Sequence, residues 1–240
     1  NSIQDYIKGK RILVTGGAGS IGSEIVRQLV NFSASTVTVF DNAEASMFHL
    51  EQEISRTFPK AHIKYVIGDV RDYDKFNTTL KYHTPDYIIH AAALKRIDDM
   101  EIHPDECVKT NIQGSENVAR AALENNIKKC ILISTDKACK PINVYGSSKF
   151  IAERMFTNYD YNSQSTIFSS VRYGNVIASR GSFIPLWIQM ASENKEINVT
   201  SEAMTRFMFT LDDAVETVLN SLYYAEGGEV FIPKINSFQM

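Results

Sequence analysis

The feature that most constrains the fold is a glycine-rich segment, Thr15–Gly22 (TGGAGSIG), between a strand-like and a helix-like stretch. The apolar run RILVT precedes it, and apolar residues follow it at helical spacing, at Ile21, Ile25 and Leu29. A short apolar run is typical of a buried strand, and a spacing of three to four residues is typical of an amphipathic helix. This order of strand, glycine loop and helix predicts the first βα unit of a parallel sheet.

Strand-like runs recur along the chain and alternate with helical segments. We expect further strands at 36–40, 63–67, 87–91, 130–134 and 167–172. Near-continuous apolar strands that alternate with helices are typical of a parallel sheet covered on both faces, and right-handed crossovers then make the sheet doubly wound. We therefore predict an α/β fold with a doubly wound parallel sheet, in which residues 1–175 form a dinucleotide-binding domain.

The alternation becomes looser after Gly174, although a helical pattern returns at 211–224. No Pro/Gly-rich linker separates this region from the rest, so we expect residues 176–240 to be substrate-binding segments woven onto the same sheet as a small lobe. The chain begins with Asn and ends in a strand-like stretch, EVFIPKINSFQM. We expect a piece of a longer protein with an incomplete C-terminal part.

Composition excludes several classes of protein. Lys and Arg number 25 against 28 Asp and Glu, a formal net charge of −3, so no global basic field favours nucleic acid or anionic lipid. Cys107, Cys130 and Cys139 lack metal-ligand spacing, which favours reduced thiols and no metal site. No apolar run reaches the ~20 residues of a membrane helix. We expect a cytoplasmic protein, or the cytosolic domain of a membrane-anchored one, without membrane contact in this segment.

The glycine loop satisfies the pattern G-x-G-x-x-G through Gly17, Gly19 and Gly22. Such a loop brings the backbone close to a pyrophosphate, and the helix that follows presents free N–H groups to it. Asp41 lies 19 residues beyond Gly22, where a carboxylate can hold the adenosine ribose hydroxyls. A carboxylate there repels a 2′-phosphate, and the neighbours Asn42 and Ala43 offer no Arg. The pattern favours NAD, with NADP as the alternative cofactor.

Two later strand ends fit the same cofactor. Asp69 follows the third strand, where its carboxylate can accept a hydrogen bond from the adenine amino group, and an Ala triplet, 91–93, ends the fourth strand with room for a dinucleotide. Taken alone, these features are also typical of a turn and of core packing. The cofactor-binding residues that we predict are Gly16, Gly17, Gly19, Ser20, Ile21, Gly22, Asp41, Asp69, Val70, Ala91, Ala92, Ala93, Lys95, Asn111, Tyr145 and Lys149.

Candidate catalytic residues follow the fifth strand: Thr135, Asp136 and Lys137 come first, and Tyr145 and Lys149 stand four residues apart in a helical segment. Residues at this spacing share a helix face, and an ammonium near a phenol lowers the phenol pKa toward working pH. Tyr145 can then exchange a proton with a substrate hydroxyl while hydride moves to nicotinamide, with Thr135 orienting the same oxygen. The alternative is an exposed Tyr–Lys pair without catalytic function.

These motifs together resemble a known superfamily. TGGAGSIG, Asp41, GDV, HAAA and YGSSK are similar to motifs of the extended short-chain dehydrogenase/reductases, which have a Rossmann fold. HAAALKR, STDKACKPINVYGSSK, VRYGNVIASRGS and MTRFMFT resemble nucleotide-sugar 4,6-dehydratases, most of all the UDP-N-acetylglucosamine 4,6-dehydratases of polysaccharide and capsule biosynthesis. The resemblance, which covers almost the whole chain, implies a bacterial lyase that acts on UDP-N-acetylglucosamine, recycles a tightly held NAD(P) and forms a homo-oligomer.

The adjacent Asp136 and Lys137 indicate proton chemistry beyond alcohol oxidation. A ketone at carbon 4 acidifies the proton on carbon 5; a base removes it, an acid protonates the departing hydroxyl of carbon 6, and hydride returns to carbon 6. The resemblance implies Lys137 as base and Asp136 as acid, although the residues alone permit the reverse, or a structural ion pair. It also implies a substrate-binding region that includes Arg172, with the contacts Lys95, Tyr173, Gly174, Asn175, Arg180 and Arg206.

Three alternatives stay open. A UDP-sugar 4-epimerase needs the same cofactor and Tyr–Lys pair but no acid–base pair for the loss of water, a 5,6-dehydratase is closer in chemistry, and a non-catalytic dinucleotide sensor needs none of these side chains. Asp136 and Lys137 favour the dehydratase. The configuration at carbon 5 stays open as well, because MTRFM and FIPKINSFQM resemble inverting enzymes, whereas TGGAGSIGSE and FDNAEASMFHLEQEI resemble membrane-anchored, retaining ones.

Overall fold

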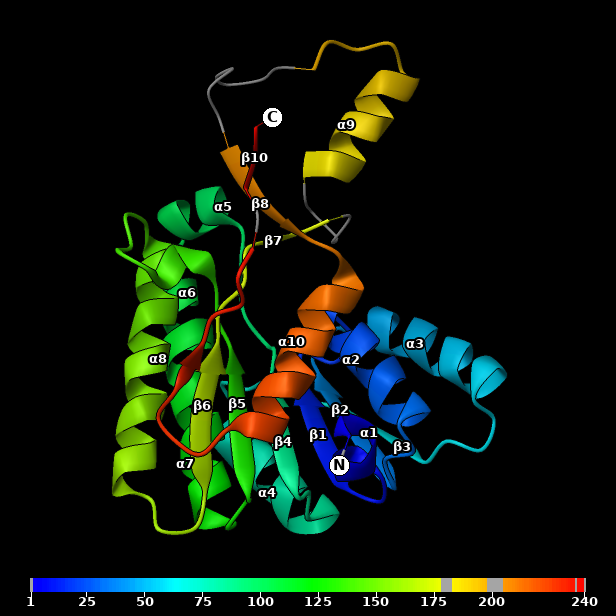
Figure 1. Cartoon of the computed structure of the whole chain (residues 1–240), viewed down its shortest axis with the longest axis vertical. Coiled ribbons are helices and arrows are strands. Elements are labelled where there is room, and N and C mark those ends of the chain that lie inside the picture. Colours follow the sequence, from blue (N-terminus) through cyan, green and yellow to red (C-terminus); the bar gives the residue numbers. More distant parts are fainter. Residues whose placement is uncertain (1, 178–182, 198–204, 236, 240) are drawn as a thin grey trace.

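Seven parallel strands form the centre of the protein (Figure 1). The computed structural model describes residues 2–177, 183–197, 205–235 and 237–239. The order of the strands across the sheet is β3-β2-β1-β4-β5-β6-β9. Their bounds are β1 Arg11–Thr15, β2 Thr36–Asp41, β3 Ile63–Ile67, β4 Tyr87–His90, β5 Lys129–Ile133, β6 Ile167–Val171 and β9 Val230–Phe231. The predicted doubly wound α/β sheet is confirmed, and each predicted strand lies within one residue of its observed bounds.

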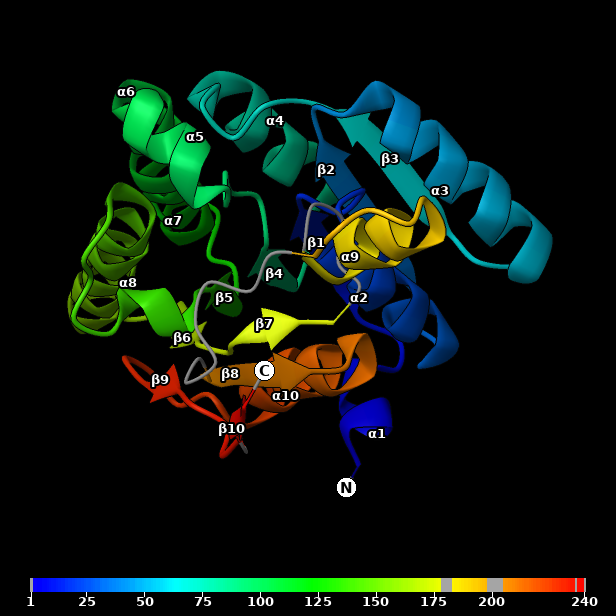
Figure 2. The same cartoon turned by 90° about the horizontal axis from the view of Figure 1, so that it is seen from above.

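Helices cover both faces of this sheet (Figure 2). Along β1, Ile12 and Val14 face one apolar core while Leu13 faces the other, as the alternation of a strand dictates. The first core is closed by α1 (Ile3–Ile7), α2 (Ser20–Asn31), α3 (Glu44–Thr57) and α10 (Leu211–Tyr224). The second core is closed by α4 (Tyr73–His83), α7 (Gly114–Glu124) and α8 (Val144–Asn162).

The strand order reverses between β1 and β4. The chain runs outward from β1 through β2 to β3, then returns to place β4 on the other side of β1, with Thr15 opposite His90. Two neighbouring strands whose crossovers leave in opposite directions open a crevice at their carboxyl ends, where ligands bind in folds of this kind. The glycine loop after β1 and the Ala triplet after β4 therefore meet at one place.

Short helical turns follow β4 and β5 at this edge of the sheet. They are α5 (Ile97–Ile102), α6 (Pro104–Cys107), the π-helical turn η1 (Val108–Gln113) and the 3₁₀ turn η2 (Asp136–Ala138). Turns of the π-helical type are rare in proteins as a whole, and those that occur are frequently found at functional sites. The turn η1 runs directly into α7, so this helix begins beside the loop that follows β4.

The C-terminal region contributes to two sheets. Helix α10 packs against α2, β5 and β6, and β9 extends the seven-stranded sheet beside β6. A second sheet has the order β10-β8-β7, with β7 at Asn175–Val176, β8 at Thr205–Phe209 and β10 at Ser237–Gln239, and α9 (Phe183–Ser192) lies near it above the main sheet (Figure 1). The boundary predicted between residues 175 and 176 falls inside β7, and it stays a prediction.

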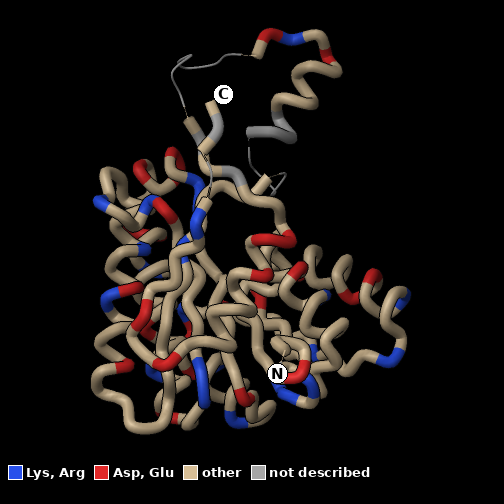
Figure 3. Tube along the Cα trace, in the orientation of Figure 1, with Lys and Arg blue, Asp and Glu red and all other residues tan. Residues whose placement is uncertain are grey.

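Positions of Lys and Arg and positions of Asp and Glu are interspersed along the Cα trace (Figure 3). Within the described ranges, no helix combines the length and apolar composition needed to span a bilayer.

The start of α8 provides a test of local stability. Asn143 is its N-cap, and the Asn143 side-chain oxygen accepts a hydrogen bond from the Gly146 backbone N–H at 2.7 Å. We expect N143A to lower the free energy of unfolding by about 1 kcal/mol, since alanine cannot accept this bond. Urea unfolding followed by circular dichroism measures the change. N143D retains an accepting oxygen and is the matched control; an equal loss in both variants would contradict the assignment of the cap.

Candidate active site

A cavity of about 490 Å³ lies where the strand order reverses. Its lining comes from the carboxyl ends of β1, β2, β3 and β4 and from the start of α2. Most of the predicted cofactor residues line it: Gly16, Gly19, Ser20, Ile21, Gly22, Asp41, Asp69, Val70, Ala91, Ala92, Ala93 and Lys95. The lining does not include the predicted Gly17, Asn111, Tyr145 and Lys149.

Two glycines make the loop after β1 possible. Gly16 has a φ of +63°, and a Cβ there would lie 2.7 Å from the Ala92 backbone. At Gly22 a Cβ would overlap the Gly16 carbonyl oxygen and lie 2.7 Å from Gly17 Cα, so α2 packs directly on the loop. The left-handed backbone that requires glycine is at Gly16, directly before the three glycines of the G-x-G-x-x-G pattern.

Asp41, at the end of β2, forms a hydrogen bond with the backbone of this loop. Its Oδ2 accepts a hydrogen bond from the Ala18 backbone N–H at 2.9 Å, and its Oδ1 accepts one from the Ala43 N–H at 2.9 Å. A carboxylate has further lone pairs for ribose hydroxyls. The glycine-rich loop, the helix start at Ser20 and this carboxylate together fit a dinucleotide whose pyrophosphate lies over the loop.

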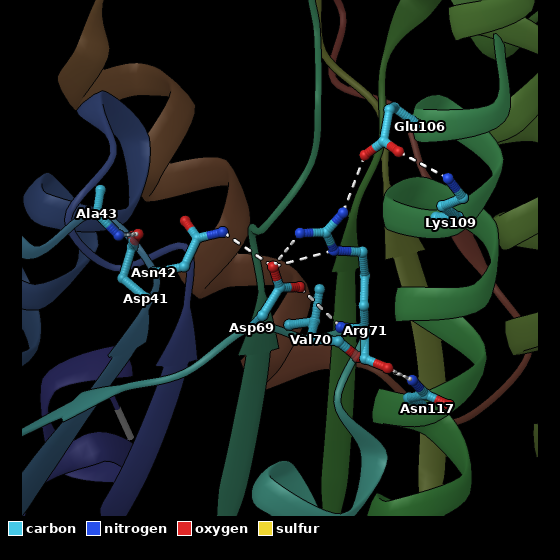
Figure 4. A network of polar contacts seen from close by, with 9 residues as sticks. All are labelled: Asp41, Asn42, Ala43, Asp69, Val70, Arg71, Glu106, Lys109 and Asn117. Carbon is cyan, nitrogen blue, oxygen red and sulfur yellow. Dashed lines mark hydrogen bonds and ion pairs between the residues drawn. The ribbon is translucent and has the colours of Figure 1, made fainter. Parts of the chain in front are cut away.

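Asp69 is held by more partners than the sequence indicated (Figure 4). Its Oδ2 accepts hydrogen bonds from Arg71 Nη2 at 2.7 Å, Arg71 Nε at 3.0 Å and Asn42 Nδ2 at 3.1 Å, and its Oδ1 accepts one from the Arg71 backbone N–H. The Arg71 guanidinium holds the pKa of Asp69 below its usual range. The predicted contact with the adenine amino group stays a prediction, and only Oδ1 has an uncrowded lone pair for it.

Arg71 is a residue of the cavity that sequence reasoning missed. Its Nη1 donates to Glu106 Oε2 at 2.9 Å, and Glu106 in turn accepts from Lys109 Nζ at 2.7 Å, so the chain of contacts crosses from β3 to α6 and η1 (Figure 4). The preference for NAD rested on the lack of an Arg beside Asp41. Arg71 comes from the loop after β3, but its charge is already matched by two carboxylates, Asp69 and Glu106.

Asn111 contacts backbone beside the cavity. Its Oδ1 accepts from the Leu94 N–H at 2.8 Å, while its Nδ2 donates to Leu94 O at 2.9 Å and to Ser148 Oγ at 3.0 Å. Asn111 therefore joins the loop after β4 to helix α8. This arrangement positions Lys95, the next residue of that loop, at the cavity wall.

The tip of β5 gathers the predicted acid–base residues. The Asp136 Oδ1 atom accepts from Thr135 Oγ1 at 2.9 Å and from Lys137 Nζ at 3.0 Å. Lys137 Nζ also donates to Asn175 Oδ1 at 3.2 Å, so β7 contributes to the same cluster. Both charged side chains keep about a third of their surface exposed, at 34% for Asp136 and 29% for Lys137. They are thus accessible to a ligand.

Helix α8 brings Tyr145 and Lys149 to the same region, but not into the predicted electrostatic relation. Burial raises the pKa of Tyr145 to about 12, and a hydrogen bond with Thr135 opposes that shift. Lys149 is 2% exposed and donates from Nζ to Ile133 O at 2.8 Å; burial lowers its pKa to about 8. The predicted lowering of the Tyr145 pKa by Lys149 is therefore wrong for this structure, since the ammonium faces the β5 backbone.

The predicted substrate residues other than Lys95 divide into three groups. Gly174 and Asn175 lie at the start of β7, and a Cβ at Gly174 would lie 2.9 Å from Phe207 Cβ of β8. Tyr173 is 6% exposed, its hydroxyl has no partner among the described residues, and burial raises its pKa. Arg180 and the side chain of Arg206 lie outside what the structure describes.

Arg172 forms an ion pair with a buried carboxylate, and its predicted place in the substrate-binding region stays a prediction. Its Nε and Nη2 donate to the two carboxylate oxygens of Glu153, at 2.8 and 2.5 Å. Glu153 was not among the predicted residues. The described residues hold no cluster of His, Cys, Asp and Glu that fits a metal ion.

The geometry defines a class of protein: a Rossmann-type dinucleotide-binding protein with a Tyr–Lys pair on the helix that follows β5. A model of the family described as polysaccharide biosynthesis protein matches residues 12–240. The chain belongs to this family, as the predicted resemblance indicated.

The relatives of this chain include proteins named as dehydratases and proteins named as epimerases. The chain is 41% identical over 236 residues to a UDP-N-acetylglucosamine 4,6-dehydratase (inverting) of Campylobacter jejuni. The aligned region covers 97% of this chain and 69% of that protein. It is 39% identical over 231 residues to a UDP-glucose 4-epimerase of Rickettsia bellii, and this aligned region covers 94% of this chain and 66% of that protein. The solved structure of Pen from Bacillus thuringiensis matches with a TM-score of 0.92 and 38% identity, covering 98% of this chain and 73% of that one.

The contact between α2 and the glycine loop yields a prediction for cofactor binding. We expect G22A to weaken NAD binding at least about tenfold, or about 1.4 kcal/mol, because the new methyl group displaces the Gly16 carbonyl and the loop. Isothermal titration calorimetry measures the affinity. G9A is the control: Gly9 has a φ of +75° and nothing within 4 Å of its Cβ position among the described residues. It should lower stability and leave NAD affinity unchanged; equal affinity in G22A and the parent would contradict the packing argument.

Proposed function

We propose that the chain is an NAD-dependent nucleotide-sugar 4,6-dehydratase that acts on UDP-N-acetylglucosamine. The observation that carries the proposal is the cluster at the tip of β5, where Asp136 Oδ1 accepts from both Lys137 Nζ and Thr135 Oγ1. Asp136 and Lys137 remain partly exposed. The relative from C. jejuni is named for this reaction and supports the substrate class. The reaction begins at the C4 hydroxyl of the sugar and ends with a methyl group at carbon 6.

The residues divide the proton transfers between them. Tyr145 takes the proton of the C4 hydroxyl, and Thr135, which bonds to Tyr145, orients the same oxygen. Bound NAD supplies reversible hydride transfer, accepting from carbon 4 and returning to carbon 6. With a ketone at carbon 4, one member of the Asp136–Lys137 pair removes the C5 proton and the other protonates the departing C6 hydroxyl. We assign the base to Lys137 and the acid to Asp136, as the resemblance implies.

Tyr145 can take the proton of the C4 hydroxyl only as a phenolate, and burial, which raises its pKa to about 12, opposes that form. The positive charge of bound NAD would favour the phenolate and lower this pKa in the complex. Lys149, with a pKa of about 8, carries its positive charge below that pH and loses it above. The proposal therefore places an upper limit near pH 8 on activity that depends on the Lys149 charge.

A 4-epimerase is the second candidate, because the relative from R. bellii bears that name and the fold, cofactor loop and Tyr–Lys pair are common to both reactions. Epimerisation needs no acid and base for the loss of water. The acid–base pair at the β5 tip favours the dehydratase over the epimerase.

Proton NMR of UDP-N-acetylglucosamine with the protein in heavy water separates the candidates. We expect a new methyl signal and deuterium at carbon 5, without added reductant. A change of configuration at carbon 4 with the C6 hydroxyl retained would instead support the epimerase, and an unchanged substrate in the presence of bound NAD would contradict both.

The variant D136N tests the role of the β5 tip in the same assay. We expect dehydration to fall by at least about a hundredfold, since the amide cannot donate an acid proton, while NAD binding stays unchanged. D74N, at an exposed position in the first turn of α4, is the matched control with the same loss of charge. Wild-type turnover in D136N would contradict the assignment.

A further inference from the structure

Glu153 is a buried carboxylate to which the mechanism above gives no role. It is 0% exposed, and it lies one helical turn after Lys149 and two turns after Tyr145 on α8. Residues at this spacing share a helix face, so all three point toward the β5 side of the helix. A buried carboxylate without compensating partners is strongly unfavourable, which makes the partners of Glu153 informative.

Its partners come from the carboxyl ends of two neighbouring strands. Arg172, the residue after β6, forms a two-bond ion pair with it, and Ser134, the residue after β5, donates from Oγ to Glu153 Oε1 at 2.5 Å. The Ser134 backbone N–H donates to Val171 O of β6. Glu153 thus joins α8, β5 and β6 directly before the segment that holds the acid–base pair.

Lys149 and Glu153 form hydrogen bonds with two consecutive residues at the end of β5. Lys149 Nζ donates to Ile133 O at 2.8 Å, and Glu153 accepts from the side chain of the next residue, Ser134. Two contacts one helical turn apart fix both the position and the rotation of the β5 end relative to α8. Any movement of Glu153 is therefore passed on to Thr135 and to the peptide that holds Lys149.

The charge of Glu153 also acts on Lys149. Burial lowers the pKa of Lys149, whereas Glu153 on α8 and, more weakly, Cys107 on α6 raise it. His90 on β4 faces the same ammonium, and burial keeps the pKa of His90 at about 3, so this ring is neutral at working pH. Glu153 is accordingly the negative charge that supports the Lys149 ammonium.

We propose that Glu153 is a positioning residue of the active site, which holds the β5 tip against α8 through Ser134 and Arg172 and supports the charge of Lys149. The inference rests on the proposed function, in which Lys149 and the β5 tip serve the reaction. The side-chain partners of Glu153 are Ser134 and Arg172, and the proton-transferring side chains of Tyr145, Asp136 and Lys137 are not among them.

The test is a titration of Lys149 by NMR of ¹³C-labelled lysine side chains in the NAD-bound protein. K149R identifies the signal, and the wild-type midpoint near pH 8 separates Lys149 from surface lysines. We expect E153Q to move this midpoint toward acid by about one pH unit or more, because the supporting charge is lost. The upper limb of the pH–kcat profile should move by the same amount, while KM changes by less than about twofold.

The variant R172Q is the matched control. It breaks the same ion pair but retains the carboxylate, so the Lys149 midpoint should stay at or above its wild-type value even where stability falls.

If E153Q does not fold, the double variant E153Q/R172Q removes both charges and leaves neither unpaired; an acid shift is expected there too. A wild-type Lys149 midpoint in E153Q, or in the double variant if E153Q does not fold, would overturn the proposal. The titration needs no turnover, so absence of dehydratase activity in the wild type would count against the proposed function alone.

Discussion

The buried ammonium of Lys149 is the constraint on which the arrangement of the site depends. A positive charge that is 2% exposed is tolerable only where hydrogen bonds and opposite charge compensate it, and the Ile133 carbonyl and Glu153 do so. Helix α8 must therefore lie against β5 at one height and one rotation. That placement brings Tyr145, one turn earlier, to Thr135 and the acid–base pair.

A second constraint acts at the other end of the cavity. The loop after β1 passes so close to β4 that Gly16 has no room for a side chain, and α2 begins directly on the same loop. The phosphate end is thus built of backbone, whereas the chain of contacts from Asp69 through Arg71 to Glu106 brings charges to the wall beyond β3 (Figure 4). The cofactor site and the β5 tip share one edge of the sheet because parallel strands all end there.

Local patterns in the sequence predict much of this architecture. The six predicted strands are short apolar runs, and their ends carry the functional residues because topology gathers them at one edge. Patterns of this kind cannot find Arg71 or Glu153, since the importance of each comes from partners 35 and 19 residues away, at Glu106 and Arg172. The error about Tyr145 has the same origin: spacing places Lys149 on the correct face but cannot show that its ammonium faces Ile133.

The central claim is that hydride leaves carbon 4 and returns to carbon 6 of the same sugar, with the β5 tip expelling water between these steps. The most direct measurement is turnover of UDP-N-acetylglucosamine that carries deuterium at carbon 4, in ordinary water, followed by mass spectrometry and NMR of the product. We expect the deuterium to appear in the new methyl group of each product molecule. A methyl group without deuterium, or a product that retains its C6 hydroxyl, would contradict it.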